Sequence, residues 1–493
     1  MSPQAANPGH SQETNPMELH VVIEGDKDLA GQLYRQLKEA IRSGRLAAGE
    51  KLPPSRLFAL QLGLSRKTVS QAYARLSFEK LLTGRVGSGT FVAEDAARKP
   101  GAAATRALAG GAMVEHWRGM STPLRHPAPA GSARYEYIGG APARDLFPHA
   151  DWRRCMLHAL RQGARSRGLY GQAEGLPELR DAIARHASFA RGVRCTAADV
   201  LVTNGAQQAL DLIARVLVEP GSTVAMEEPG YPPARLLLAG QGAKVVGVPV
   251  DGEGLVVERI PDGTRLIYVT PAHQFPLGMP MSERRRKALL KRADELGAIV
   301  IEDDYDSEFR YEGRPADSLQ SMDGNGRVVF AGTFSKTLAP DLRLGYLIAP
   351  PDVLEAAATA RYLSDCHTAT PAQWALAKFI ADGELNRHIR RCHAAYAQRR
   401  ERIVRRFAKD LSPWFELVPI TAGIHMAALC RRETDIDQLV RLARRVDVGL
   451  YPLSPFFHFS PPRQGLMLGF GAIGEADIDP SLDRVRDVLV QMD

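Results

Sequence analysis

The sequence lacks any long apolar run. None of its 493 residues belongs to a stretch that approaches the ~20 consecutive apolar residues of a membrane-spanning helix. Residues 1–28 are rich in Pro, Gln, Asn and Ser, and they lack the apolar core of a secretory signal. We therefore expect neither a membrane span nor a targeting segment, and we predict a disordered leader over residues 1–28.

Cysteine is scarce, and its spacing forms no C-x-x-C pair. The five cysteines are Cys155, Cys195, Cys366, Cys392 and Cys430. An odd number of scattered cysteines predicts reduced thiols, as in a cytoplasmic protein, and argues against a disulfide framework or a zinc site. We therefore expect a cytoplasmic protein with no metal site.

Acidic residues are few near the N-terminus. Between Leu29 and Ala93, eleven Lys and Arg face three Asp and Glu, a net charge of +8, whereas the whole chain carries +7. A basic segment on a near-neutral chain indicates a polyanionic partner for that segment alone, although a solubilising surface explains the charge equally well. The length of 493 residues predicts roughly two or three domains.

Three helices are predicted within this basic segment. Apolar residues four apart from Leu29 to Ile41 indicate an amphipathic helix over 29–43. Ser55 is the expected N-cap of a second helix over 56–62, and Ser65 that of a third helix over 66–76. A short helix, a glycine turn and a helix with basic residues in its first turn form a helix-turn-helix pattern, in which the last helix enters the major groove.

The segment from Leu81 to Val92 predicts a β-hairpin with a glycine-rich tip, which is a wing. Together with this wing, the segments 52–56, 65–69 and 87–92 resemble the winged helix-turn-helix of GntR-type bacterial regulators. That resemblance covers residues 29–93 and implies double-stranded DNA, in operator half-sites, as a partner. The expected DNA-contacting residues are Arg56, Ser65, Arg66, Lys67, Thr68, Gln71, Arg85, Gly87 and Gly89.

Residues 94–133 are rich in Ala, Gly, Pro and Arg, which predicts a tether with a short helix near 113–120.

Residues 134–493 alternate short apolar runs with helical segments, which predicts an α/β domain around a largely parallel sheet. Its large part is expected at about 175–350, and its small part at about 134–174 and 351–493. The predicted strands of the sheet lie at 200–202, 223–226, 244–248, 266–269, 299–301, 328–330 and 344–348.

Reactive side chains follow several of these strands. Lys336 stands among hydroxyls after the strand at 328–330, and Asp303 and Tyr305 follow the strand at 299–301. Gly205 and Ala206 open a helix after the strand at 200–202, which makes a seat for a phosphate. Because chemistry in such sheets gathers at the carboxyl ends of the strands, we expect these residues to lie together.

Pyridoxal phosphate needs such a set of groups: an amine for the Schiff base, a carboxylate for the pyridinium, a hydroxyl, an aromatic ring and a phosphate seat. Taken singly, each residue is more often a surface or core residue. The segments 170–180, 271–278 and 335–337 resemble fold type I, class I aminotransferases. This resemblance implies that Lys336 forms the Schiff base, Asp303 pairs with the pyridinium nitrogen, and Tyr305 meets the ring oxygen.

The same resemblance assigns stacking on the ring to Tyr231. It also implies that the phosphate is bound by Gly205, Ala206, Thr333 and Arg343. It further implies that Tyr170 reaches into the site of a partner subunit, and hence that the protein is a homodimer. A GntR-type head on such a body resembles the MocR/GabR regulators.

Two positions depart from the aminotransferase pattern. Met467 stands where the family places the arginine that binds the substrate α-carboxylate, and Phe275 replaces an asparagine before Pro276. Arg235, Arg361 and Arg463 are the alternative cations. Both departures weaken the case for an amino-acid transaminase.

The sequence leaves three hypotheses for the function of the protein. The leading one is a transcriptional regulator that senses pyridoxal phosphate, or an amine through it. The alternative is a working pyridoxal-phosphate-dependent aminotransferase with an accessory head. The third is a plain DNA-binding repressor with a vestigial body.

Overall fold

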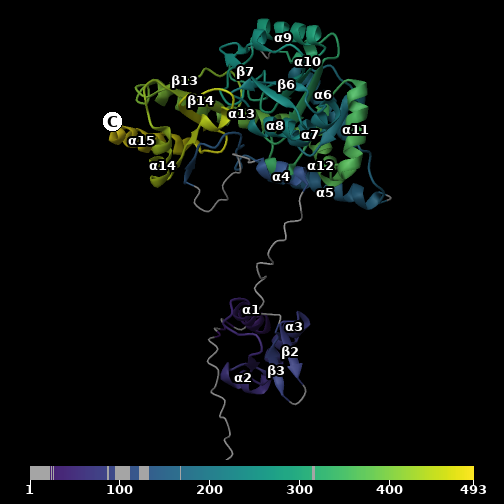
Figure 1. Cartoon of the computed structure of the whole chain (residues 1–493), viewed down its shortest axis with the longest axis vertical. Coiled ribbons are helices and arrows are strands. Elements are labelled where there is room, and N and C mark those ends of the chain that lie inside the picture. The colour runs from purple at the N-terminus through teal and green to yellow at the C-terminus, as the bar shows by residue number, and fades with distance from the viewer. Residues whose placement is uncertain are drawn as a thin grey trace, which may run out of the picture. The chain divides into compact units, whose positions relative to one another are not determined.

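The structure is a computed structural model and describes residues 21, 23, 25, 27–85, 88–94, 111–120, 133–166, 168–313 and 317–493. The chain divides into two compact units, Met1–Glu115 and His116–Asp493, which we call the head and the body (Figure 1). Each unit is described by itself. Among the described residues, no helix is both long and apolar enough to cross a bilayer.

The head is a small helical domain with a three-stranded antiparallel sheet in the order β1-β3-β2. Its core joins the apolar faces of its first and third helices, where Leu33, Leu37, Val69 and Leu76 are fully buried. Its elements are α1 (Leu29–Arg42), β1 (Lys51–Leu52), α2 (Ser55–Gln61), α3 (Arg66–Phe78), β2 (Leu82–Arg85) and β3 (Gly89–Val92).

The predicted helix starts are right for α3 and wrong for α2. Ser65 caps α3, since its side chain accepts a hydrogen bond from the Thr68 amide. Ser55, in contrast, is the first residue of α2, and Pro54 occupies the N-cap position. The Pro54 carbonyl accepts the Phe58 amide at 3.0 Å, so the helix begins one residue earlier than a side-chain cap would place it.

The body is built on an eight-stranded sheet in the order β5-β12-β11-β10-β9-β6-β7-β8. The central strands are parallel, whereas β12 pairs antiparallel with both of its neighbours and β8 pairs antiparallel with β7. The bounds are β5 (Val200–Thr203), β6 (Thr223–Glu228), β7 (Lys244–Asp251), β8 (Gly254–Leu255), β9 (Thr264–Val269), β10 (Ile299–Asp304), β11 (Val328–Thr333) and β12 (Gly345–Ile348). These strands include every strand expected for the sheet.

Helices cover both faces of this sheet, because successive side chains of its buried strands point to opposite sides. Leu201 and Leu347 pack with α7, α8 and α11, whereas Val200 and Ile348 pack with α5, α6 and α12. In a third apolar cluster, α9 packs against β9 and β10. The helices are α5 (His149–Arg165), α6 (Pro177–Arg191), α7 (Ala206–Leu217), α8 (Pro232–Gly240), α9 (Glu283–Leu296), α10 (Leu319–Met322), α11 (Pro351–Asp365) and α12 (Thr370–Ala381).

The C-terminal part of the body carries a second antiparallel sheet in the order β13-β14-β17-β16, packed with three helices around its own core. A two-stranded pairing of β4 and β15 ties it to the start of the body. The bounds are β4 (Tyr135–Glu136), α13 (Glu384–Ala408), β13 (Phe415–Leu417), β14 (His425–Cys430), α14 (Ile436–Arg445), β15 (Val448–Gly449), β16 (Tyr451–Pro452), β17 (Gly465–Gly469) and α15 (Glu475–Met492). The tether contains α4 (Ala112–Gly119), close to the short helix expected there.

Candidate functional site

Lys336 lies in the turn that follows β11 and lines a cavity of about 420 Å³. Burial lowers the pKa of its amine, although Asp306 and Asp303 act in the opposite direction. Thr333 and Ser335 stiffen the turn, because the Thr333 hydroxyl contacts Ser335 Oγ at 3.0 Å and accepts the Ser335 amide at 3.1 Å. The fold thus holds one amine with a lowered pKa inside a cavity, as nucleophilic lysines require.

Asp303 is the penultimate residue of the neighbouring strand β10 and lines the same cavity. Its Oδ2 accepts the Tyr268 hydroxyl at 2.6 Å, whereas its Oδ1 is buried and has no hydrogen-bond partner. Burial raises the pKa of this carboxyl to about 6, and the Tyr268 hydrogen bond opposes that shift. A buried carboxylate oxygen without a donor suits a cationic N–H group placed in the cavity.

Tyr305 also lines the cavity, but its hydroxyl hydrogen is already used. It donates to the His273 carbonyl at 2.7 Å, and the oxygen lies 3.2 Å from His273 Nδ1. His273 Nδ1 in turn faces Asp306 Oδ1 at 2.9 Å. In this arrangement Tyr305 must reorient its hydroxyl before it can donate to a ligand oxygen.

The N-terminus of α7 and Arg343 form the cationic end of the cavity. Gly205 is the N-cap of α7 with φ +77°, and a Cβ on it would lie 2.7 Å from Arg343 Nη2. Arg343 Nη2 donates to the Asn204 carbonyl at 2.9 Å, so the guanidinium is held beside the free amides of the helix start. Ala206 lines the cavity from the first turn. An arginine beside a helix N-terminus suits a phosphate group.

Aromatic side chains form much of the remaining wall. Tyr231 precedes α8 and lies edge-on to Phe275, with ring centroids 5.3 Å apart. Burial raises the pKa of Tyr231 to about 12, so its hydroxyl is neutral. Phe456 closes the wall at 5.1 Å from Phe275.

Among the described residues that line the cavity, none is the additional arginine expected to hold a substrate carboxylate. Met467 of β17 is 7 % exposed, and its Cε is 2.5 Å from where a Cβ on Gly139 would stand. None of the alternative arginines lines the cavity. Arg361 is buried against Asp365 and the Val202 carbonyl, Arg235 faces His458, and Arg463 is exposed.

His425 is a cavity residue that the sequence reasoning missed. It begins β14, is 0 % exposed and lines the cavity beside Lys336. A histidine at the start of an apolar strand was its one sequence signal. Within the described residues, His273, Asp306 and His425 are also the one grouping of metal-type ligand atoms, all within 4.8 Å of one another.

Tyr170 lies outside this cavity. Its side chain is 84 % exposed, and its nearest ring is that of His367, 6.0 Å away. The structure therefore does not bring Tyr170 to Lys336 within one subunit.

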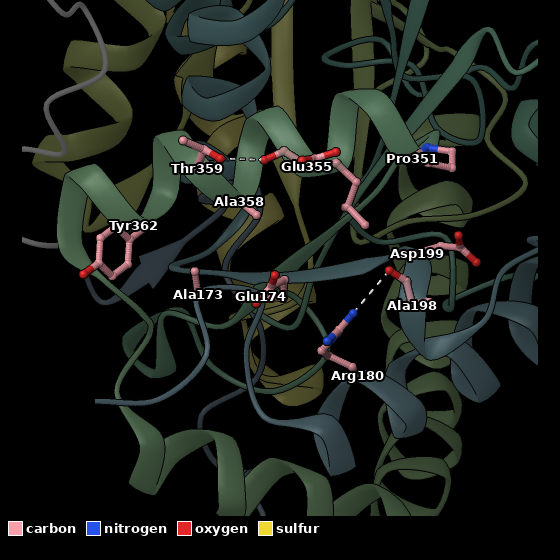
Figure 2. A pocket seen from close by; sticks show the side chains of 11 residues that line it. Ala173, Glu174, Arg180, Ala198, Asp199, Pro351, Glu355, Ala358, Thr359 and Tyr362 are labelled. Atoms are coloured by element: carbon pink, nitrogen blue, oxygen red, sulfur yellow. Dashed lines mark hydrogen bonds between the residues drawn. The ribbon is translucent and has the colours of Figure 1, made fainter. Parts of the chain in front are cut away.

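A second hollow, of about 540 Å³, lies elsewhere on the body (Figure 2). One wall is α11, where the Thr359 hydroxyl donates to the Glu355 carbonyl at 3.1 Å. Across it, Arg180 Nη2 donates to the Ala198 carbonyl at 3.2 Å. Figure 2 shows no lysine among the drawn side chains, so this hollow offers no amine for imine chemistry.

In the head, the described DNA-contacting candidates are exposed, except for Thr68, which is half-buried. Arg56 is exposed in the first turn of α2, and Arg66, Lys67 and Gln71 are exposed on α3. The Thr68 hydroxyl lies 2.8 Å from Ser65 Oγ, so both hydroxyls also serve the helix start. On the wing, Gly89 has φ +117° and Arg85 is exposed, 3.6 Å from Glu94, whereas Gly87 lies outside the described residues.

Comparison with known proteins agrees with this two-part layout. Residues 29–92 match the family described as bacterial regulatory proteins, gntR family, and residues 147–457 match aminotransferase class I and II. The chain is 36 % identical over 478 residues to the probable rhizopine catabolism regulatory protein MocR of Rhizobium meliloti, covering 96 % of both chains. The chain belongs to the MocR/GabR-type regulators.

Two further relatives of this MocR/GabR-type chain are also regulators. TauR of Rhodobacter capsulatus is 34 % identical over 94 % of this chain and 97 % of its own, and the pyridoxine biosynthesis regulator PdxR of Corynebacterium glutamicum is 32 % identical over 93 % and 95 %. Among solved structures, Pyrococcus horikoshii kynurenine aminotransferase matches with a TM-score of 0.67 and 27 % identity, over 72 % of this chain and 90 % of that one. The MocR/GabR-type body therefore has the aminotransferase fold, and the predicted fold class is confirmed.

Proposed function

We propose that this regulator binds pyridoxal phosphate in the cavity around Lys336 and binds operator DNA as a homodimer through its heads. The carrying observation is Asp303 Oδ1, a buried carboxylate oxygen without a donor in a cavity that also holds an amine with a lowered pKa. Both features suit a pyridinium aldehyde. When bound, the cofactor supplies an aldehyde that condenses with a primary amine.

Different residues of the cavity would hold different parts of the cofactor. Asp303 holds a proton on the pyridine nitrogen, Arg343 and the α7 N-terminus hold the phosphate, and Tyr231 covers the ring. Lys336 supplies the amine, and its lowered pKa favours the neutral form that reacts. The bound state of this cavity would then set the DNA affinity of the heads, which requires two states with different ligand affinities.

A homodimer is supported by apolar surface near Tyr170. Leu169, Tyr170, Tyr362 and Leu363 are all at least 60 % exposed. Tyr362 borders the hollow of Figure 2, and Tyr170 contacts His367 just beyond the end of α11. Exposed aromatic and apolar residues gathered in this way are typical of a subunit interface.

We place the protein in the cytoplasm, where its DNA partner is found.

The test follows cofactor absorbance and DNA binding together on the full chain. Wild type should gain visible absorbance on titration with pyridoxal phosphate, and its affinity or footprint on its own promoter region should change. Lys336→Ala should lose both responses. Lys291→Ala removes a lysine that is 81 % exposed on α9 and should keep both.

Unchanged DNA affinity, footprint and bending with the cofactor and with a panel of amines would refute the regulatory proposal. The second candidate function, a working aminotransferase, is favoured by the shared fold. It predicts steady turnover of an amino acid with a keto-acid acceptor, which the lack of a carboxylate-binding arginine in the cavity argues against.

A further inference from the structure

Two side chains of the small sheet face the cavity together. Strands β14 and β17 pair antiparallel, with His425 opposite Gly469 and Ala427 opposite Met467. Because side chains alternate along a strand, His425 and Met467 lie on the same face of this sheet. Both line the cavity that holds Lys336.

The charges around the cavity disfavour an anionic ligand beside these two residues. Among the described lining residues, Lys336 and Arg343 are the only Lys or Arg side chains. Arg343 lies at the α7 N-terminus, where the proposed phosphate would use it. Asp303 lines the cavity and Asp306 is buried behind it, 1 % exposed on its side chain. A carboxylate beside Met467 would therefore be buried without a cation, which is costly.

His425 offers hydrogen bonds but no charge. Burial, together with the nearby His273 and Lys336, lowers the pKa of its imidazole to about 3, against weaker effects from Asp306 and the Pro276 carbonyl. Apart from a weak contact with the Pro276 carbonyl, neither ring nitrogen has a hydrogen-bond partner in the structure, although the side chain is fully buried. A neutral imidazole has one donor and one acceptor nitrogen, so it pairs well with a hydroxyl or amide.

The ring of His273 is 4.4 Å from that of His425, and ligand atoms of His273 and Asp306 lie within 4.8 Å of one on His425. The His425 ring also lies 5.6 Å from that of Phe275 and is stacked 6.2 Å from that of Tyr305. A buried polar group without a partner costs about 1–3 kcal/mol, and a ligand that satisfies it recovers that cost. Because His425 lines the cavity and its ring nitrogens are unsatisfied, a polar group of a ligand can pair with it.

We infer that the effector is a primary amine without a carboxylate that carries a neutral hydrogen-bonding group, such as a hydroxyl, for His425. This inference rests on the proposed function, because the amine has to meet the cofactor at Lys336. Met467 excludes the α-carboxylate of ordinary amino acids, and His425 selects among the remaining amines. The effector class is then amino alcohols and their relatives.

Three probes that share the isobutylamine unit separate these features. Valinol carries a hydroxyl, valine a carboxylate, and isobutylamine neither. Each is titrated into the full-length, cofactor-loaded protein, and apparent affinity is read from cofactor absorbance. Ligand-induced stabilisation is read from urea unfolding by tryptophan fluorescence, since all four tryptophans belong to residues 116–493.

For wild type, valinol should bind tightest, isobutylamine about 10-fold weaker for the lost hydrogen bond, and valine on the order of 100-fold weaker. Met467→Arg should reverse the order of valine and valinol, whereas Met467→Leu should preserve it. His425→Phe should remove the advantage of valinol over isobutylamine. Without ligand, His425→Phe should not lower the urea midpoint, because it deletes an unsatisfied buried group.

Failure of this inference and failure of the proposed function give different results. Valine binding as tightly as valinol to wild type, or an unchanged probe order in both Met467→Arg and His425→Phe, would overturn the inference while leaving the proposed function standing. A protein that gains no Lys336-dependent absorbance with pyridoxal phosphate fails the proposed function, and the inference fails with it.

Discussion

The carboxyl of Asp303 allows a test of the site that does not depend on knowing the effector. Its pKa is raised from 3.8 to about 6, chiefly by burial. A raised carboxyl pKa destabilises the folded protein once the group ionises. The penalty is absent below the ordinary pKa, grows between pH 3.8 and about 6, and is complete above that. At pH 7 the shift corresponds to about 3 kcal/mol in the cofactor-free protein.

Asp303→Asn should remove this penalty. The asparagine oxygen still accepts the hydrogen bond that Tyr268 now donates at 2.6 Å, so the loss of contacts is small. The cofactor-free variant should therefore be more stable than wild type by about 1–3 kcal/mol at pH 7. Near pH 5 this advantage should shrink by about 1 kcal/mol, because wild-type Asp303 is then mostly protonated.

Pyridoxal phosphate should offset most or all of this advantage. Wild type at one hundred times Kd gains about 2.7 kcal/mol, and the variant gains much less because asparagine cannot pair with the pyridinium. Urea unfolding of the body is followed by tryptophan fluorescence, with and without cofactor.

Asp304→Asn is the matched control on the adjacent position of β10. Asp304 pairs with Arg191, and both side chains are at most 7 % exposed. Its loss should destabilise the body by more than about 2 kcal/mol with or without cofactor. A cofactor-free Asp303→Asn protein less stable than wild type by more than ~1 kcal/mol, or one that keeps the full cofactor-induced gain, would refute the reasoning.

Further predictions concern the wall of the cavity and the DNA surface. Gly140→Ala should cost about 1 kcal/mol and weaken cofactor absorbance, because Gly140 has φ +72° and a Cβ there would lie 2.9 Å from Lys336 Nζ. Gly163→Ala, in α5 with no neighbour within 4 Å, should instead raise stability by about 0.5–1 kcal/mol and leave cofactor absorbance unchanged. Arg66→Ala should lower the preference for operator over random DNA by ~1–3 kcal/mol in competitive gel-shift titrations, and equal loss on both DNAs would show that it reads no base. Lys67→Ala should weaken binding to operator and to random DNA alike. It should also reduce the slope of log affinity against log salt concentration by about one, because one phosphate contact is lost.

The predicted elements were recovered well because their signals are local. The buried runs of β10 and β11 and the serine cap of α3 depend on residues near one another in the chain. Ser55 was misplaced by one residue, because Pro54 supplies a backbone carbonyl and leaves no role for a side-chain cap. Most of the site residues that follow the strands, among them Lys336, Asp303 and Ala206, line one cavity, because the carboxyl ends of parallel strands meet at one edge of the sheet.

The sequence alone determined the two-part layout, the strand ends that carry Lys336 and Asp303, and the absence of an arginine at position 467. Only the tertiary structure decided that Arg235, Arg361 and Arg463 stay away from the cavity, and that His425 enters it with no partner. The physical reason is the distance along the chain. Strand ends are set by local patterns, whereas the pairing of β14 with β17 and the burial of His425 arise from contacts between segments that only folding brings together.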